Sequence, residues 1–256
     1  MSTETTEITG FRQTVESVTP RIRLVLESVR EVVKRPSALI GSILLLLILM
    51  TSIAFPVLYH TDPLAQDLLG RLAPPVWQSG GTWSHPLGTD NLGRDVLSRL
   101  LHGSRISLLV GFSAVLVAEV VGIILGLISG YYGGKTDSFI MRIADIFMAY
   151  PFMLLTISVI AVLGPSILNL IIVLGISDWV TYARTIRGSV LSLKRKEYVE
   201  ASRAIGASHI IIIIRHILPN VISPLLILGT LRVANIIIWE SGLSYLGMGV
   251  PPPMPT

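Results

Sequence analysis

The triplet Gly134-Lys135-Thr136 has the residue types that end a phosphate-binding loop. Such a loop follows the pattern G-x-x-x-x-G-K-[ST], in which backbone N–H groups surround the phosphates before a helix begins. The pattern requires a glycine where this chain has Ser129, and the glycine stands one residue too close, at Gly130. The preceding letters "LGLISG" belong to an apolar stretch rather than to a strand–loop–helix unit. We therefore expect a glycine-rich turn here, with Asp137 near the start of the next helix, and no nucleotide site.

The other residues that could carry chemistry form no catalytic pattern. The chain has no cysteine, which excludes disulfides, thiolate nucleophiles and cysteine metal sites. Neither an H-E-x-x-H zinc motif nor a G-x-S-x-G nucleophile elbow occurs. The five histidines are scattered outside the apolar stretches, at His60, His85, His102, His209 and His216. The sequence therefore predicts no catalytic residue and no metal site, which disfavours a membrane enzyme.

The composition is that of an integral membrane protein. Hydrophobic residues make up 51% of the 256 residues and charged residues only 14%. Long uncharged apolar stretches set the class, because about 20 apolar residues in a helix cross the hydrocarbon core of a bilayer. We expect an all-α bundle with five spans, at Ala38–Tyr59, Ile106–Ser129, Ile140–Leu163, Ser166–Tyr182 and Val221–Trp239.

The distribution of lysine and arginine predicts the orientation, since positive residues concentrate on the cytoplasmic side. With a cytoplasmic N-terminus, the inner segments 1–37, 130–142 and 183–218 carry six, two and seven basic residues. The outer segment 60–105 carries four. We therefore expect a basic cytoplasmic tail over 1–37, a first span over 38–59, an extracytoplasmic loop over 60–105 and a transmembrane domain over 106–256. The N-terminus does not resemble a cleavable signal peptide.

Four ionisable residues fall within or at the ends of the expected spans, at Glu119, Asp178, Arg232 and Glu240. Charges inside a bilayer are costly, so such residues usually face a cavity, a pathway or one another. Two interpretations remain open. The four residues line a polar path for a zwitterionic substrate, or they form ion pairs that hold the bundle together.

The inner segment that contains residues 187–219 is too long for a simple turn between two spans. Good helix formers occupy 197–204, and Gly206 can end that helix in a turn. We expect a short helix, a glycine turn and a second helix presented to the cytoplasm, either for a partner protein or merely as a solvated loop. Pro219 suits the start of the following helix.

Two further stretches have helical or apolar patterns but are not expected to span the membrane. The letters "HIIIIIR" at His209–Arg215 are too short to span a bilayer, and we expect the apolar face of a short helix buried in the protein. The stretch Asn91–Gly103 has apolar residues at helical spacing and predicts a short surface helix, serving as a cap on the bundle or as a docking surface.

The inner segment carries a family resemblance. The letters "VEASRAIGASHIIIIIRHILPN" resemble the cytoplasmic EAA loop of permease subunits of bacterial ABC importers. Ser202 replaces the second alanine of E-A-A, a change of one small residue for another. By this resemblance, the residues that contact the ATPase are Glu200, Ala201, Ser202, Gly206, Leu218 and Pro219.

Three more stretches resemble the dipeptide/oligopeptide/nickel subfamily of these permeases. They are "HPLGTDNLGRDVLSRLLHGSRISL", "GYYGGKTDSFIMRIADIF" and "ESGLSYLGMGVPPP", and they occur in the family's order. Members of the family usually have six spans, and the given letters end where the last span is expected, so the expected fold allows for one more helix.

The resemblance implies a mechanism and partners. A second permease subunit completes the pathway, two ATP-binding subunits hold ATP and Mg on the cytoplasmic side, and an extracytoplasmic solute-binding protein delivers the substrate. The chain is then a non-catalytic, multi-pass protein of a bacterial cytoplasmic membrane, surrounded by lipid and with no nucleic-acid partner. Import of di- or oligopeptides is the first expectation and import of nickel the alternative. An ion-coupled transporter acting alone is disfavoured, because no inverted repeat or ion site stands out.

Overall fold

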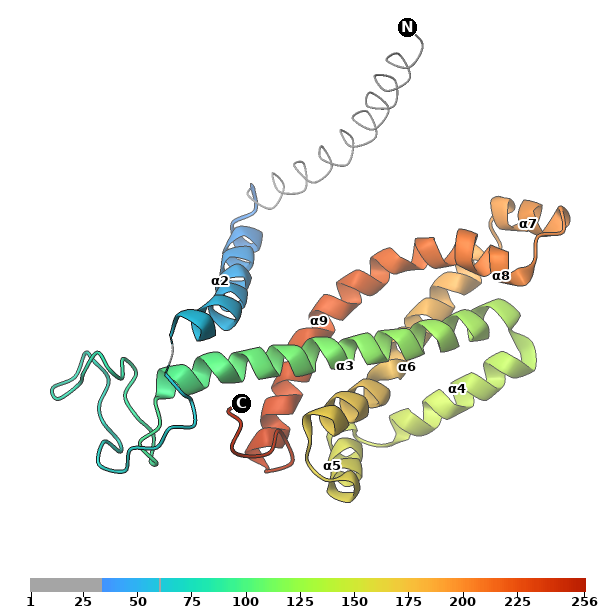
Figure 1. Ribbon diagram of the computed structural model, residues 1–256. Helices are drawn as coiled ribbons and strands as arrows, with labels where there is room; N and C mark the ends of the chain where they lie inside the picture. Colours follow the sequence, from blue (N-terminus) through green and yellow to red (C-terminus); the bar gives the residue numbers. More distant parts are fainter. Residues whose placement is uncertain (1–33, 60) are drawn as a thin grey trace, which may run out of the picture. The chain divides into compact units, whose positions relative to one another are not determined.

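The computed structural model describes residues 34–59 and 61–256 and separates into two compact units, Met1–Leu58 and Tyr59–Thr256 (Figure 1). Most of the expected basic tail lies outside the described residues. The described part of the first unit is essentially helix α2, Pro36–Leu58. Its side chains from Ile40 to Met50 are largely exposed and apolar, as a lipid-facing helix requires. Helix α2 is long and apolar enough to cross a membrane, at the place where the first span is expected.

The second unit is a helical bundle. Its elements are α3 (Val96–Tyr132), α4 (Gly134–Ala149), α5 (Phe152–Leu163), α6 (Ile167–Leu193), α7 (Glu197–Ala204), α8 (His209–Ile211), the π-helix η1 (Ile212–Ile217) and α9 (Leu218–Tyr245). Within the described ranges the only β-type pairing is an isolated bridge between Thr89 and Asp95. The all-α fold class is thereby confirmed.

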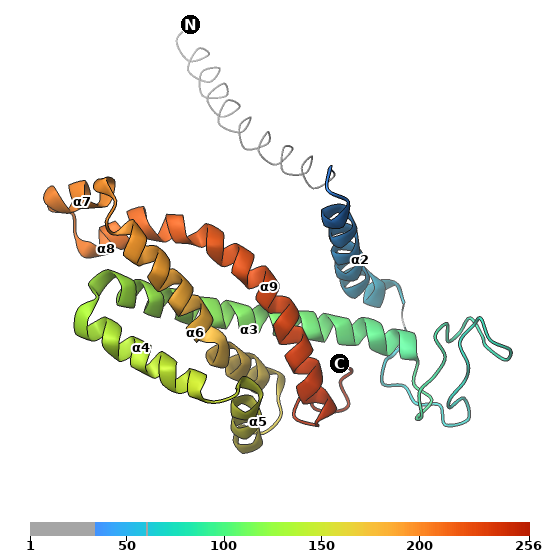
Figure 2. The ribbon, with the colours of Figure 1, turned by 180° about the vertical axis from the view of Figure 1, so that it is seen from behind.

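Figures 1 and 2 show α4, α6 and α9 packed against the long helix α3. One end of this bundle carries the Gly133 turn together with α7 and α8, and we call it the turn end. The other end carries the irregular segment 61–95 and the C-terminus, and we call it the loop end. Four helices are long and apolar enough to cross a membrane. The pair α4 and α5, bent by 88°, gives a fifth crossing if it forms one span, in agreement with the five expected spans.

Two helices begin earlier than the sequence pattern predicted. The side chain of Asp95 accepts from the backbone N–H of Leu97 at 2.9 Å and so caps α3 at Val96. The predicted surface helix at Asn91–Gly103 is therefore wrong as a separate element, because its helical part is the start of α3. Similarly, η1 runs without interruption into α9, so Pro219 lies in a continuing helix rather than after a turn.

The isoleucine run is not a buried short helix, as we had expected. It forms α8 and η1 at the start of the continuous apolar segment His209–Tyr245. Ile212 is fully buried, but Ile210 and Ile214 are 65% and 59% exposed. The expectation was wrong because the length of the run was judged alone, whereas the helix extends through Pro219 into the next span.

Pro151 divides the expected third span into two helices. Proline has no N–H to donate and disfavours helical backbone in the residue before it. Helix α4 ends at Ala149, Tyr150 is extended, and α5 starts at Phe152 in a new direction. Residues on both sides of this bend line a cavity.

A row of glycines on α3 sets its distance from α6. A Cβ on Gly122 would collide with the Cβ of Tyr182, and one on Gly126 would lie 2.7 Å from the carbonyl oxygen of Ala183. Gly130 meets Val190 in the same way, at 2.7 Å. Residues spaced by four lie on one helix face, and small residues there permit close approach of membrane helices. Helices α3 and α6 therefore pack backbone against backbone.

We predict that Gly126→Ala destabilises the bundle, because the added methyl group has no room beside the α6 backbone. The expected loss is about 1–3 kcal/mol in the free energy of unfolding. The matched control is Gly188→Ala on α6, whose added Cβ has no neighbour within 4 Å among the described residues. Thermal unfolding in detergent should show a lower midpoint for Gly126→Ala alone. Equal midpoints for the two variants would contradict close α3–α6 packing.

Asp90 organises the irregular segment at the loop end. Its carboxylate accepts from the backbone N–H groups of Leu92 and Arg94, at 2.9 and 3.0 Å, and from Arg94 Nε at 2.7 Å. Burial raises the pKa of Asp90, but these N–H groups and the guanidinium outweigh it and hold the pKa below its ordinary value of 3.8.

This lowered pKa predicts an acid-sensitive contribution to stability. A carboxylate with a depressed folded pKa stabilises the fold fully above its unfolded pKa and loses that contribution as the pH falls through the folded value. The thermal midpoints of the wild type and Asp90→Asn should therefore differ near neutral pH and converge below about pH 3.8. A difference that stays constant into that range would show that the charge of Asp90 is not responsible.

Candidate functional site

Helix α7 and the turn after it are largely exposed at the turn end. Glu197 and Glu200 lie in its first turn and Arg203 in its last, an arrangement that complements the helix dipole. The helix closes in a Schellman motif: Gly206 N–H donates to the carbonyl of Arg203 and Ala207 N–H to that of Ser202, at 3.0 and 3.1 Å. Gly206 has φ +82°, a left-handed conformation that glycine adopts without strain.

The segment Glu197–Ile211, which we call the helix–turn segment, presents an exposed surface. Glu200, Ala201 and Gly206 are exposed, Ser202 is partly so, and Ile205 at the turn is 85% exposed. Val199 is fully buried and anchors α7 to the bundle core. A short helix with small residues on its outward surface, followed by a turn with an exposed apolar side chain, is suited to lie in a groove of a partner protein.

The structure brings together four of the six residues that the resemblance assigns to coupling, and separates two. Leu218 is half-buried and Pro219 exposed at the start of α9, beyond the π-helix. Ser202 links the two parts, because its hydroxyl lies 3.3 Å from His216 Nε2 on η1. Leu218 and Pro219 therefore lie at the base of the helix–turn segment and not on its exposed surface.

The Gly-Lys-Thr triplet lies beside this segment and forms the first residues of α4, directly after the turn at Gly133. Gly133 and Gly134 both have positive φ, at 68° and 54°, so the chain reverses here as the sequence predicted. Lys194, at the end of α6, donates to the carbonyl of Gly130 at 2.9 Å. Tyr131 on α3 is hydrogen-bonded to His209 on α8 at 2.8 Å. The end of α3 is thus bonded to the end of α6, just before the helix–turn segment, and to α8 within that segment.

Asp137 provides the strongest of these connections. Arg187 on α6 donates to both of its carboxylate oxygens at 2.6 Å, a bidentate pair, and Ser129 donates to one of them. Two parallel N–H···O bonds fix orientation as well as distance. Asp137 therefore locks the start of α4 to the end of α6.

We predict that Arg187→Gln lowers the stability of the turn end. Each lost hydrogen bond to a charged group lowers the free energy of unfolding by about 1.5–3 kcal/mol when the group is buried. The partial exposure of this pair makes the expected loss smaller. Arg184→Gln is the control, because Arg184 pairs with Asp145 at 2.7 Å while both side chains are about half exposed. A double-mutant cycle with Asp137→Asn in thermal unfolding should show coupling for Arg187 and almost none for Arg184 with Asp145→Asn. Equal coupling in the two cycles would refute the special role of this pair.

The four ionisable residues of the expected spans lie at three separate positions in the bundle. Arg232 Nη1 lies 3.4 Å from Asp178 Oδ1, and Arg232 Nη2 donates to Thr181 Oγ1 at 2.9 Å. Glu119 on α3 faces α9, where a Cβ on Gly229 would lie 2.6 Å from its Oε1. Glu240 is fully buried and accepts from Ser107 and Ser244, at 2.9 and 2.8 Å. The structure pairs Asp178 with Arg232 and holds Glu240 separately by hydroxyl groups.

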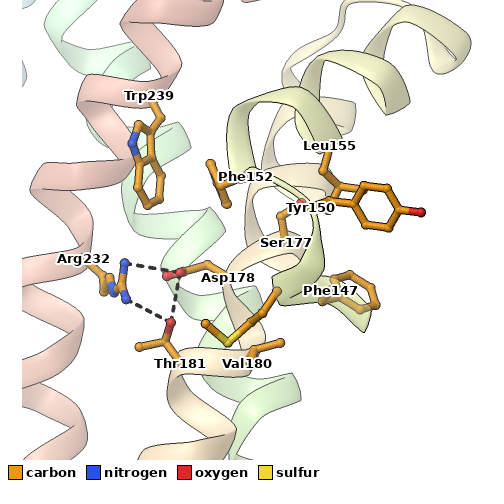
Figure 3. Close-up of a pocket in the computed structure, with 11 residues that line it drawn as sticks. Phe147, Tyr150, Phe152, Leu155, Ser177, Asp178, Val180, Thr181, Arg232 and Trp239 are labelled. Carbon is orange, nitrogen blue, oxygen red and sulfur yellow. Dashed lines mark hydrogen bonds and ion pairs between the residues drawn. The ribbon is translucent and has the colours of Figure 1, made fainter. Parts of the chain in front are cut away.

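A cavity of about 250 Å³ opens beside the Asp178–Arg232 pair, at the bend between α4 and α5 (Figure 3). Aromatic residues that no sequence pattern had indicated line it, among them Phe147, Phe152 and Trp239. The Phe152 and Trp239 ring centroids are 4.0 Å apart. Pro151 was the available signal, since a proline within an apolar span indicates a break.

The helical bundle and its exposed helix–turn segment define a multi-pass membrane protein of the ABC-importer permease class. Residues 122–256 match the family model described as "Binding-protein-dependent transport system inner membrane component". The chain belongs to this family, as the curated relatives also show.

Two relatives illustrate the similarity. The dipeptide transport system permease protein DppC of Haemophilus influenzae is 40% identical over 85% of this chain and 74% of its own length. The oligopeptide transport system permease protein OppC of Bacillus subtilis is also 40% identical, over 85% of this chain and 69% of its own length. A chain of the MetNI methionine ABC transporter in an inward-facing conformation shares the fold, with a TM-score of 0.52 and 22% identity over 59% of this chain and 76% of that chain.

Proposed function

We propose that this chain is the membrane subunit of an ATP-driven importer of di- or oligopeptides and that it forms the pathway with a second permease subunit. The observation that carries the proposal is the exposed helix–turn segment, whose small residues and Schellman turn suit a groove on an ATP-binding subunit. The permease proteins named for dipeptide and oligopeptide transport support the substrate class. Neither relative supports the nickel alternative.

The proposed assembly has further partners. Two ATP-binding subunits bind ATP and Mg and carry out the hydrolysis, while this chain has no catalytic role. An extracytoplasmic solute-binding protein delivers the peptide. The excess of basic residues in 1–37, 130–142 and 183–218 supports a cytoplasmic N-terminus and a cytoplasmic turn end, in a bacterial cytoplasmic membrane.

Motion of the helix–turn segment reaches the bundle through contacts that are already in place. Val199 packs in the core, and Tyr131 and Lys194 join the segment to the end of α3. A displacement of α7 by the ATP-binding subunits therefore shifts α3, α4 and α6 together. In this proposal Asp178, Arg232, Glu119 and Glu240 border the substrate path.

We predict that Gly206→Val uncouples ATP hydrolysis from uptake. A branched side chain at φ +82° costs about 1–2 kcal/mol, which distorts the turn. Uptake of alanyl-alanine by the reconstituted complex should fall roughly tenfold. Ala201→Trp tests the same surface without backbone strain, since Ala201 is exposed and a large side chain there would block a groove.

The control is Lys135→Ala at the start of α4, where the exposed lysine has the residue type of a phosphate loop but not its spacing. Nucleotide binding and uptake should remain at the wild-type level. Loss of nucleotide binding in an intact Lys135→Ala complex would overturn the assignment of ATP to the partner subunits. Wild-type uptake by both Gly206→Val and Ala201→Trp would overturn the coupling role of the segment.

A further inference from the structure

The cavity lies between the α4–α5 bend, α6 and α9, and its lining is of two kinds. Asp178, Thr181 and Arg232 come from the central parts of α6 and α9, and Phe152 and Trp239 form an aromatic wall (Figure 3). Sites for small ligands are mostly apolar, with a few polar groups that fix orientation, and typically measure about 300–1,000 Å³. At about 250 Å³, this cavity can take one end of a peptide rather than a whole oligopeptide.

Asp178 has a hydrogen-bonding capacity that the bundle does not use. Its side chain is only 5% exposed, yet its Oδ2 atom has no hydrogen-bond partner among the described residues. Its other oxygen is 3.4 Å from both Arg232 Nη1 and Thr181 Oγ1. Buried polar atoms are almost always satisfied, so a carboxylate oxygen left open beside a cavity points to a ligand that donates to it.

A purely structural ion pair would look different. Such a pair joins α6 to α4, where Arg187 donates to both carboxylate oxygens of Asp137 at 2.6 Å. The pair of Asp178 and Arg232 is longer, uses one carboxylate oxygen, and leaves part of the guanidinium's five donors uncommitted in the contacts described. The bidentate pair at Asp137 therefore joins α4 to α6, whereas the pair of Asp178 and Arg232 has the longer distance and fewer hydrogen bonds.

The break in the α4–α5 span places the ends of two helices, and therefore two opposite partial charges, at the cavity. The last turn of α4, with Phe147 and Met148, and the first turn of α5, with Phe152 and Leu155, both border the cavity. A helix carries partial negative charge at its C-terminus and partial positive charge at its N-terminus. The cavity therefore offers sites for a cation and for an anionic or carbonyl oxygen side by side, as broken helices do in transporters.

We propose that this cavity binds the amino end of the transported peptide. The α-ammonium donates to Asp178 Oδ2 beside the end of α4, and Arg232 donates to the following carbonyl or carboxylate oxygen. The first side chain of the peptide lies against Phe152 and Trp239. A dipeptide carries one charge of each sign and adds no net charge to a low-dielectric site, which makes a short zwitterionic peptide the fitting class of ligand. The inference rests on the proposed peptide-import function.

The absence of cysteine in this chain provides a direct test. In Ser177→Cys, the thiol lies on the cavity wall, and its alkylation by N-ethylmaleimide can be followed on this chain by mass spectrometry in the reconstituted complex. Alanyl-alanine should slow the alkylation, and N-acetyl-alanyl-alanine, which lacks the ammonium, should not. Ser158→Cys on the exposed side of α5 is the control and should react equally with and without peptide.

Asp178→Asn, combined with Ser177→Cys, should raise the alanyl-alanine concentration needed for protection roughly ten- to a hundredfold, as expected for loss of a hydrogen bond to a charged group. Asp145→Asn, which breaks an exposed ion pair between α4 and α6, should leave that concentration unchanged. Equal protection by the free and acetylated peptides, or no protection by either, would overturn the inference even if Asp178→Asn fails to assemble.

Uptake of alanyl-alanine by the wild-type complex, measured in the same vesicles, separates the two proposals. Uptake without protection of Ser177→Cys overturns the binding site and leaves the import function standing. A wild-type complex that imports no peptide overturns the import function, and with it the assignment of the cavity.

Discussion

The arrangement of the bundle depends on the close contact of α3 with α6. Gly122, Gly126 and Gly130 bring the two backbones together along three turns, where a single added methyl group would collide. Because this contact fixes the end of α6 against the end of α3, Lys194 can reach Gly130 and Arg187 can grip Asp137. These contacts fix the end of α6 and therefore the start of α7. A force on this short helix would in this way be transmitted to the bundle.

The ion pairs that α6 makes with Asp137 and with Arg232 differ in geometry and, we propose, in role. The bidentate pair at Asp137 joins the elements of the turn end, where motion imposed on the helix–turn segment would enter the bundle. The looser pair at Asp178 lies at the bend that Pro151 creates, next to an aromatic wall and two helix ends. The same helix thus connects the proposed coupling surface with the proposed peptide site, about four turns apart by the helical repeat.

The sequence predicted the parts of the structure that depend on local pattern. Apolar length indicated the spans, the failed phosphate-loop spacing indicated the glycine turn, and Gly206 indicated the end of α7. The misjudged parts depend on more distant residues of the chain or on neighbouring helices. Asp95 extends α3 backwards, and the isoleucine run continues through Pro219 into α9. The pairing of Asp178 with Arg232, and the aromatic wall beside them, arise only from tertiary packing and have no sequence pattern of their own.

Cross-linking from the exposed tip of the helix–turn segment would decide whether this segment contacts the ATP-binding subunits, on which the proposed function depends. Ile205 is 85% exposed at the turn, so a photoreactive amino acid introduced there should meet whatever lies in contact with α7. In membranes that contain the whole transporter, we expect a covalent adduct with an ATP-binding subunit, and none from the same group placed at Leu231 on the exposed side of α9. Adducts only with lipid, in a complex that still imports peptide, would contradict the proposed coupling role.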